Sequence, residues 1–227
     1  MAIPREENCE REPANPRANH RNFSRPTHFF TLQRGVAIVT EAKTSYLNAL
    51  TQSLKMLVAQ LNPVVGDVKG NKALAEAAHA EGKAKGAELI VFSELFILGY
   101  PAEDLVLKPA AVEHSLAAIE DLKALTNDGP GMLIGSPWRD GDKLHNSVLL
   151  LQEGEIRLRY DKRELPNYGV FDEKRIFDAG EGAHELVELN GVKVGSAICE
   201  DIWYSRVPAA LHEAGAEVLL VPNASPW

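Results

Sequence analysis

Cysteine is scarce in this sequence of 227 residues, since only Cys9 and Cys199 occur and they lie far apart in the chain. Two distant cysteines provide neither a disulfide framework nor the paired spacing of a zinc site. The seven histidines are scattered, so we expect no bound metal ion. One thiol therefore remains as a candidate for chemistry.

Positive charge is also in short supply, with 24 basic residues against 32 acidic ones and a net charge of -8. Such a chain has no electrostatic footprint for DNA, RNA or an anionic membrane, so a small molecule is the favoured partner. No apolar run approaches the roughly 20 residues that a membrane-spanning helix needs, and the N-terminus lacks the apolar segment and cleavage site of a secretory signal. We therefore expect a soluble, cytoplasmic protein.

Regular patterning is missing from the first part of the chain, residues 1–54. Up to about Gln33 the sequence is rich in Pro, Asn and Arg and has no helical or strand periodicity, which favours disorder. Four acidic residues argue against a mitochondrial presequence, namely Glu6, Glu7, Glu10 and Glu12. We interpret residues 1–54 as a disordered segment or an extension outside the main domain.

The pattern changes at Lys55, where apolar runs of strand length begin to alternate with helical stretches. This alternation is typical of an α/β protein with buried strands. The turns Glu153–Gly154 and Asn190–Gly191 each separate two strand-like runs, which predicts two antiparallel hairpins and hence a mixed sheet. We expect helices at 71–85, 112–125 and 206–214, the last capped by Ser205, and strands at 56–61, 88–92, 132–134, 147–151, 155–160, 185–189, 192–198 and 217–221. Gly135 and Pro137 are expected to end the strand at 132–134.

Cys199 directly follows the apolar stretch 192–198 and precedes Glu200, so it lies where a predicted strand ends. A strand end can project a nucleophile into a crevice, and the backbone N–H groups of the following turn can face an oxyanion. Taken alone, however, a free cysteine is more often a small buried hydrophobic residue.

Two charged residues occupy similar positions. Glu94 lies between the apolar stretches 89–92 and 95–98, and a partly buried carboxylate suits a general base, although a solvated acid or a structural ion pair is the alternative. Lys162 follows the predicted strand 155–160 in a charged stretch that is otherwise typical of a solvated strand end. Together with Cys199 they supply a base, a cation for an oxyanion and a nucleophile, which are the groups that acyl transfer needs.

Three motifs around these residues resemble the signatures of the nitrilase, or carbon–nitrogen hydrolase, superfamily. In chain order they are Phe92-Ser93-Glu94-Leu95, Tyr160-Asp161-Lys162 and Ala197-Ile198-Cys199-Glu200-Asp201-Ile202-Trp203. Further segments are similar to the glutaminase domain of glutamine-dependent NAD synthetases, namely Ala59-Gln60-Leu61-Asn62-Pro63, Gly66-Asp67, 99–105 and 165–173. The resemblance covers residues 55–227.

This resemblance implies an α/β fold, the nitrilase-like αββα sandwich with mixed sheets. It also implies that Glu94 takes the proton of Cys199, whose thiolate attacks the side-chain amide of glutamine, while Lys162 and the backbone N–H of Glu200 stabilise the oxyanion. Glu173 matches a second glutamate near the site of the superfamily, which could orient Lys162 or the substrate amine. The candidates for the glutamine pocket are Tyr100, Tyr168, Phe171 and Ser225, and ordinary aromatic packing is the alternative for Tyr100 and Phe171.

In the glutaminase domains that this sequence resembles, further strands and helices follow the position equivalent to Trp227. We therefore expect a sandwich that is incomplete at its C-terminus. The synthetase domain, which uses ATP and magnesium to convert deamido-NAD to NAD with the released ammonia, is expected to be absent, and no cofactor is expected in this chain. The resemblance implies glutamine as the substrate, the synthetase domain as a partner and assembly into a homo-oligomer. A free-standing amidase or N-carbamoyl hydrolase and an inactive fragment are the alternative interpretations.

Overall fold

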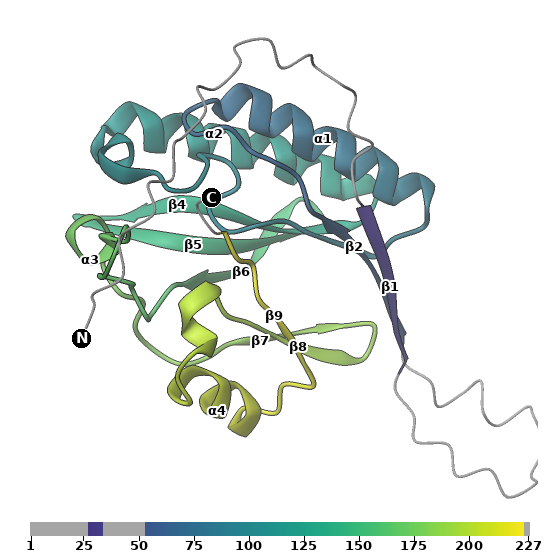
Figure 1. Cartoon of the computed structure of the whole chain (residues 1–227). Helices are drawn as coiled ribbons and strands as arrows, with labels where there is room; N and C mark the ends of the chain where they lie inside the picture. Colours follow the sequence, from purple (N-terminus) through teal and green to yellow (C-terminus); the bar gives the residue numbers. More distant parts are fainter. Residues whose placement is uncertain (1–26, 34–52, 225–227) are drawn as a thin grey trace, which may run out of the picture.

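The computed structural model describes residues 27–33 and 53–224 and contains two mixed β-sheets with helices on their outer faces (Figure 1). The strands are β1 (Thr27–Gln33), β2 (Ser53–Ala59), β3 (Leu89–Val91), β4 (Gly131–Asp140), β5 (Lys143–Gln152), β6 (Glu155–Asp161), β7 (Leu186–Leu189), β8 (Val192–Ser196) and β9 (Val218–Leu220). The α-helices are α1 (Val68–Ala84), α2 (Pro109–Leu125), α3 (Glu173–Ile176) and α4 (Arg206–Glu213). Among the described residues, short 3-10 helices join them, namely η2 (Glu103–Leu107), η3 (Thr126–Asp128) and η4 (Cys199–Ile202).

The larger sheet has the strand order β1-β2-β3-β4-β5-β6, and the smaller one has the order β7-β8-β9. Parallel pairs join β2 to β3, β3 to β4 and β8 to β9, whereas the remaining pairs are antiparallel. The predicted mixed sheet and both predicted hairpins, β5–β6 and β7–β8, are therefore confirmed.

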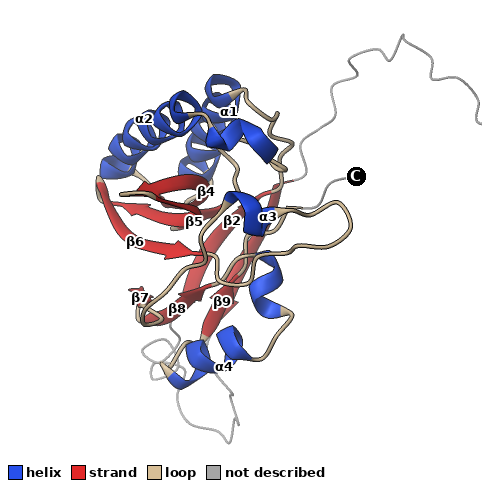
Figure 2. Cartoon of the chain, turned by 90° about the vertical axis from the view of Figure 1, so that its left-hand side faces the viewer, coloured by secondary structure: helices blue, strands red, loops and turns tan. Residues whose placement is uncertain are grey.

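The elements form layers, with α1 and α2 over one face of the larger sheet, the smaller sheet facing its other side, and α4 on the outer face of the smaller sheet (Figures 1 and 2). One apolar core joins the helices to the larger sheet through residues such as Ala75, Ile119 and Ile90. A second core lies between the two sheets and includes Leu150 and Val194. The fold is thus of the α/β class with mixed sheets, as predicted.

Apart from shifts in the bounds of several helices and strands, three details differ from the prediction. β4 does not end at Gly135 but continues through Pro137 to Asp140. β3 pairs with β4 only as far as Leu133. Pro137 lies beyond this point, so its missing N–H group does not interrupt the hydrogen bonds between β3 and β4. Ser205 precedes α4, but its side chain makes no capping hydrogen bond.

The third difference concerns the segment expected to be disordered. Residues 27–33 form β1, which pairs along its whole length with β2. The expectation of disorder is therefore wrong for these seven residues, because pairing with a neighbouring strand supplies an order that local periodicity does not reveal. The other residues up to 52 lie outside the described part of the chain.

Candidate active site

The structure brings together three side chains that are far apart in the sequence. Glu94 follows β3, Lys162 directly follows β6, and Cys199 opens η4 just after β8. Lys162 Nζ lies 2.6 Å from Glu94 Oε1, and Glu94 is close enough to Cys199 to raise the pKa of its thiol. The three residues that sequence reasoning selected therefore form one cluster at the ends of strands from both sheets.

The Lys162 ammonium is fully buried and is held by two carboxylates. It donates hydrogen bonds to Glu94 Oε1 at 2.6 Å and to Glu173 Oε1 at 2.9 Å. Burial opposes the charge on Lys162, but the two carboxylates outweigh it and raise the pKa of this side chain. Burial also raises the pKa of Glu173, which the neighbouring Lys162 counteracts in part. Lys162 therefore remains charged over the physiological pH range.

Cys199 adopts an unusual backbone conformation, with a φ of +46°. A left-handed conformation at a residue other than glycine costs roughly 1–3 kcal/mol and is common at functional sites. Its N–H donates to the carbonyl of Pro222 at 3.1 Å, which anchors the turn to the segment after β9. Burial raises the pKa of the Cys199 thiol to about 12, and the charge of Glu94 adds to the effect, so the resting side chain is a neutral thiol.

Two buried residues that the sequence did not single out support this cluster. Asn146 on β5 donates from Nδ2 to Glu94 Oε1 at 2.8 Å. Asp201, two residues after Cys199, is fully buried and accepts four hydrogen bonds. Their donors are the N–H groups of Ile198, Arg163 and Glu164 and the hydroxyl of Tyr160, at 2.8 to 3.0 Å.

The four bonds of Asp201 join the turn that carries Cys199 to the segment that carries Lys162. Asp201 stands inside the motif around Cys199, and this position was the available signal. Asn146 gave no such signal, because its contact with Glu94 spans 52 residues of sequence.

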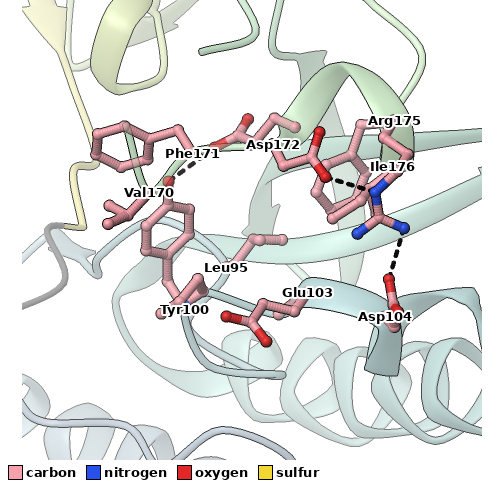
Figure 3. Close-up of a pocket in the computed structure, with 13 residues that line it drawn as sticks. Leu95, Tyr100, Glu103, Asp104, Val170, Phe171, Asp172, Arg175 and Ile176 are labelled. Atoms are coloured by element: carbon pink, nitrogen blue, oxygen red, sulfur yellow. Dashed lines mark hydrogen bonds and ion pairs between the residues drawn. The ribbon is translucent and has the colours of Figure 1, made fainter. Parts of the chain in front are cut away.

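A cavity of about 210 Å³ lies beside Glu173, the second carboxylate that Lys162 contacts. Figure 3 shows residues that line this cavity, among them Tyr100 and Phe171. Tyr100, Phe171 and Glu173 contribute to its wall, and the Tyr100 hydroxyl donates to Glu173 Oε1 at 2.9 Å. Burial and the neighbouring carboxylates raise the pKa of Tyr100, so its hydroxyl stays protonated. Cys199 is not among the lining residues, and Glu173 is the residue that the cavity and the cluster share.

The other two pocket candidates lie elsewhere or outside the described residues. Tyr168 does not line this cavity, and it packs edge-on against Phe171 and donates to Glu200 Oε2 at 2.8 Å. That hydrogen bond raises the pKa of Tyr168 to about 12. The Glu200 side chain is thereby held beside Cys199, with Tyr204 3.4 Å from its other oxygen. Ser225 lies outside the described residues.

Within residues 27–33 and 53–224, no group of three or more His, Cys, Asp or Glu side chains is arranged to hold a metal ion. In the same part of the chain, no helix has the length and apolar character needed to cross a membrane.

The fold and the cluster of buried Glu94 and Lys162 with the half-buried Cys199 define a nitrilase-type α/β protein. The family profile described as carbon-nitrogen hydrolase matches residues 57–227, and the chain belongs to this family.

Its relatives are mainly longer proteins. The glutamine-dependent NAD(+) synthetase of Rhodobacter capsulatus is 43% identical over 178 residues, which cover 78% of this chain and 32% of the relative. The corresponding protein of Thermotoga maritima is 40% identical over 177 residues, covering 77% and 30%. The chain thus spans about a third of the length of these curated relatives.

The solved structures similar to this chain also include a glutamine-dependent NAD+ synthetase, together with an amidase. The glutamine-dependent NAD+ synthetase of Acinetobacter baumannii in complex with ADP has a TM-score of 0.69 and 34% identity, covering 77% of this chain and 33% of that one. An amidase from Nesterenkonia sp. has a TM-score of 0.68 and 25% identity, covering 77% and 66%.

Proposed function

We propose that this chain is a glutamine-hydrolysing module that supplies ammonia for the ATP-dependent amidation of deamido-NAD to NAD. The observation that carries the proposal is the cluster in which the buried Glu94 pairs with Lys162 and lies close enough to Cys199 to raise the pKa of its thiol. The identity of about 40% to the first third of glutamine-dependent NAD synthetases supports the choice of glutamine as substrate.

The first step is the activation of Cys199. A thiol with a pKa of about 12 is a weak nucleophile at neutral pH, so its proton must leave as the sulfur attacks. Glu94 is the proposed acceptor, because its carboxylate is close enough to raise the pKa of the thiol. The sulfur electron pair then forms a bond to the amide carbon, and the carbonyl electron pair moves onto the oxygen.

The resulting oxyanion requires hydrogen-bond donors. An ammonium group has three N–H bonds, and Lys162 uses one on Glu94 and one on Glu173, which leaves one for the substrate oxygen. The second donor in this proposal is the backbone N–H of Glu200, which lies in the first turn of η4, where N–H groups have no partner inside the helix. Donors that are fixed in a dry site stabilise such an anion strongly.

Collapse of this intermediate breaks the carbon–nitrogen bond, and the proton held by Glu94 passes to the departing nitrogen, so that ammonia leaves. The Cys199 thioester that remains is attacked by a water molecule whose proton Glu94 accepts. Glutamate then departs, and the proton returns to the Cys199 sulfur. Glu94 therefore acts in both halves of the reaction, and each half restores its carboxylate.

The cavity beside Glu173 offers space for the amino-acid end of the substrate, with Tyr100 and Phe171 on its wall. Tyr168 and Ser225 are proposed as further binding residues. ATP and magnesium belong in this proposal to a synthetase domain, which is the proposed partner, and not to the residues of the cluster. Assembly into a homo-oligomer and a cytoplasmic location complete the proposal.

Measuring ammonia release tests the substrate. The chain is incubated with glutamine, with other ω-amides and with N-carbamoyl compounds, and Cys199→Ala serves as the control. We expect release from glutamine and at least about a hundredfold loss in the control, since the nucleophile is removed. Preference for any other compound would contradict the proposal.

A free-standing amidase is the second candidate, because the similar Nesterenkonia structure is an amidase of which this chain covers 66%. It predicts preference for a simple aliphatic amide in the same assay. An inactive fragment is the third candidate. It predicts no release from any substrate and no cooperative thermal melting, which circular dichroism would reveal.

A further inference from the structure

The two carboxylate oxygens of Glu94 differ in the hydrogen bonds that they accept. Oε1 accepts one from Lys162 at 2.6 Å and one from Asn146 at 2.8 Å. Oε2 accepts one from the N–H of Ala224 at 3.1 Å. Each carboxylate oxygen has about two lone-pair sites. Oε1 is therefore filled, whereas Oε2 retains one lone-pair site for which the described residues record no donor in addition to Ala224. Glu94 is also close enough to Cys199 to raise the pKa of its thiol, so the open site on Oε2 is the one available to the thiol proton.

Asn146 connects the two charged members of the cluster. Its carbonyl accepts the N–H of Lys162 at 2.8 Å, while its side chain donates to Glu94, so one fully buried residue fixes the backbone of the first and the carboxylate of the second. The orientation of the amide follows from charge, because a flipped amide would place its oxygen against Glu94 Oε1.

The oxygen of the same side-chain amide lacks a hydrogen-bond partner. Asn146 Oδ1 is buried and has no hydrogen-bond partner in the described part of the chain. Burying an acceptor without a hydrogen-bond partner destabilises the folded protein, because the acceptor loses its hydrogen bonds to water and gains none in their place. A residue selected for stability alone at this position would be apolar, so the amide is retained for what its N–H group does to Glu94.

We infer that Asn146 is a positioning residue that reserves Glu94 Oε2 as the base for Cys199, by occupying Oε1 together with Lys162. This inference rests on the proposed function. The terminal torsion of a glutamate has a broad, roughly two-fold preference, so a carboxylate held by fewer donors can present either oxygen to the thiol. Without the amide, Glu94 spends less time aligned with the sulfur, and the proton transfer that precedes attack becomes slower.

The test compares Asn146→Leu, which keeps the approximate shape, with Ser147→Ala as the matched control. Ser147 is the next residue on β5, is equally buried, and donates its hydroxyl to Asp161 Oδ1 at 2.6 Å. Each variant removes one side-chain hydrogen bond made by a buried residue, but only the first removes a bond to Glu94. We expect kcat for ammonia release to fall about 10- to 100-fold in Asn146→Leu with little change in KM, because a misplaced base slows the chemical step. Asn146→Ala replaces Asn146→Leu if the latter does not fold.

A second measurement does not depend on turnover. The hydrogen bond with Glu94 helps to raise the pKa of the Cys199 thiol, so a loosened Glu94 moves the pH midpoint of iodoacetamide alkylation of Cys199 to lower pH. The control variant should keep the wild-type midpoint. If wild-type protein releases no ammonia from any amide, the proposed function fails, and the alkylation midpoint still decides the role of Asn146. A kcat and a midpoint equal to those of Ser147→Ala would overturn the inference.

Discussion

Lys162 donates a hydrogen bond of 2.6 Å to Glu94, and both side chains are completely buried. Glu173, the second acceptor of Lys162, is nearly as buried, so one cation faces two carboxylates in the protein interior. Burying a charge away from water costs free energy unless an opposite charge lies beside it, and here Lys162 and the two glutamates compensate one another. Loss of any one of these charges should therefore destabilise the fold as well as disturb its proposed chemistry.

The first prediction concerns this stability. Lys162→Met keeps the length of the side chain but leaves two buried carboxylates without their cation. Removing one partner of a buried ion pair leaves the other charge buried without compensation. We therefore expect the free energy of unfolding to fall by about 3–5 kcal/mol. This fall in the free energy of unfolding is measured by urea denaturation, with circular dichroism as the signal.

Arg206→Met is the control for this experiment. Arg206 forms an ion pair with Glu164 at 2.8 Å, but its side chain is 64% exposed. An exposed pair contributes about 0–1 kcal/mol, so the control should lose little. Equal losses in both variants would contradict the prediction.

The second prediction concerns the pH dependence of Cys199. Burial and, after it, the charge of Glu94 raise the pKa of this thiol to about 12. Glu94→Gln removes the negative charge, so the pKa of the thiol falls and the thiolate forms at lower pH. The midpoint of alkylation should move to lower pH, whereas ammonia release should fall at least about a hundredfold, because the base is lost.

These opposite responses separate two roles of one residue. A variant in which alkylation and ammonia release both became faster would show that Glu94 only suppresses the thiolate. Glu113→Gln, which changes an exposed glutamate of α2, serves as the control and should leave both measurements unchanged.

The sequence predicted the three central residues for a physical reason. Cys199 and Glu94 each follow an apolar run of strand length, Lys162 follows a strand-like run of alternating polar and apolar residues, and the ends of strands can meet at one edge of a layered fold. The two hairpins were predictable from their turns, since Glu153 and Asn190 adopt the positive φ that such turns require.

What the sequence did not reveal depends on contacts between distant segments. Asn146 reaches Glu94 across 52 residues, and no local pattern distinguishes it from other polar residues of a strand. β4 was predicted to end early, because the proline signal is local while the pairing that tolerates it is not. β1 was missed for the same reason, since its order comes from β2.

The third prediction concerns Asp201, whose carboxylate joins the Cys199 turn to the Lys162 segment. Asp201→Asn places an NH2 group where the carboxylate oxygens accept four hydrogen bonds, so part of the set must break. Hydrogen bonds to charged groups contribute about 1.5–3 kcal/mol, and we expect a loss of that order in the free energy of unfolding. Ammonia release should also fall about tenfold or more, because the two segments lose their relative position.

Asp178→Asn is the matched control for Asp201. Asp178 is exposed, and its carboxylate accepts one backbone N–H, from Leu144 at 2.9 Å. It should change stability by less than about 1 kcal/mol and leave ammonia release intact. If Asp201→Asn behaves in the same way, the four hydrogen bonds do not position the cluster.

The last prediction concerns Gly135 on β4, which lies against the backbone that carries Glu94. A Cβ atom at this position would lie 2.3 Å from the N atom of Leu95 and 2.9 Å from the carbonyl carbon of Glu94. Gly135→Ala therefore forces the Glu94 segment to shift, and a shift of about 1 Å in a reacting group can lower a rate about a hundredfold. Gly131→Ala on the same strand is the control, since its Cβ would meet no atom closer than the Leu151 carbonyl at 3.2 Å. We expect ammonia release to fall at least about tenfold more in Gly135→Ala than in the control, and equal activities would mean that Glu94 does not depend on this close approach.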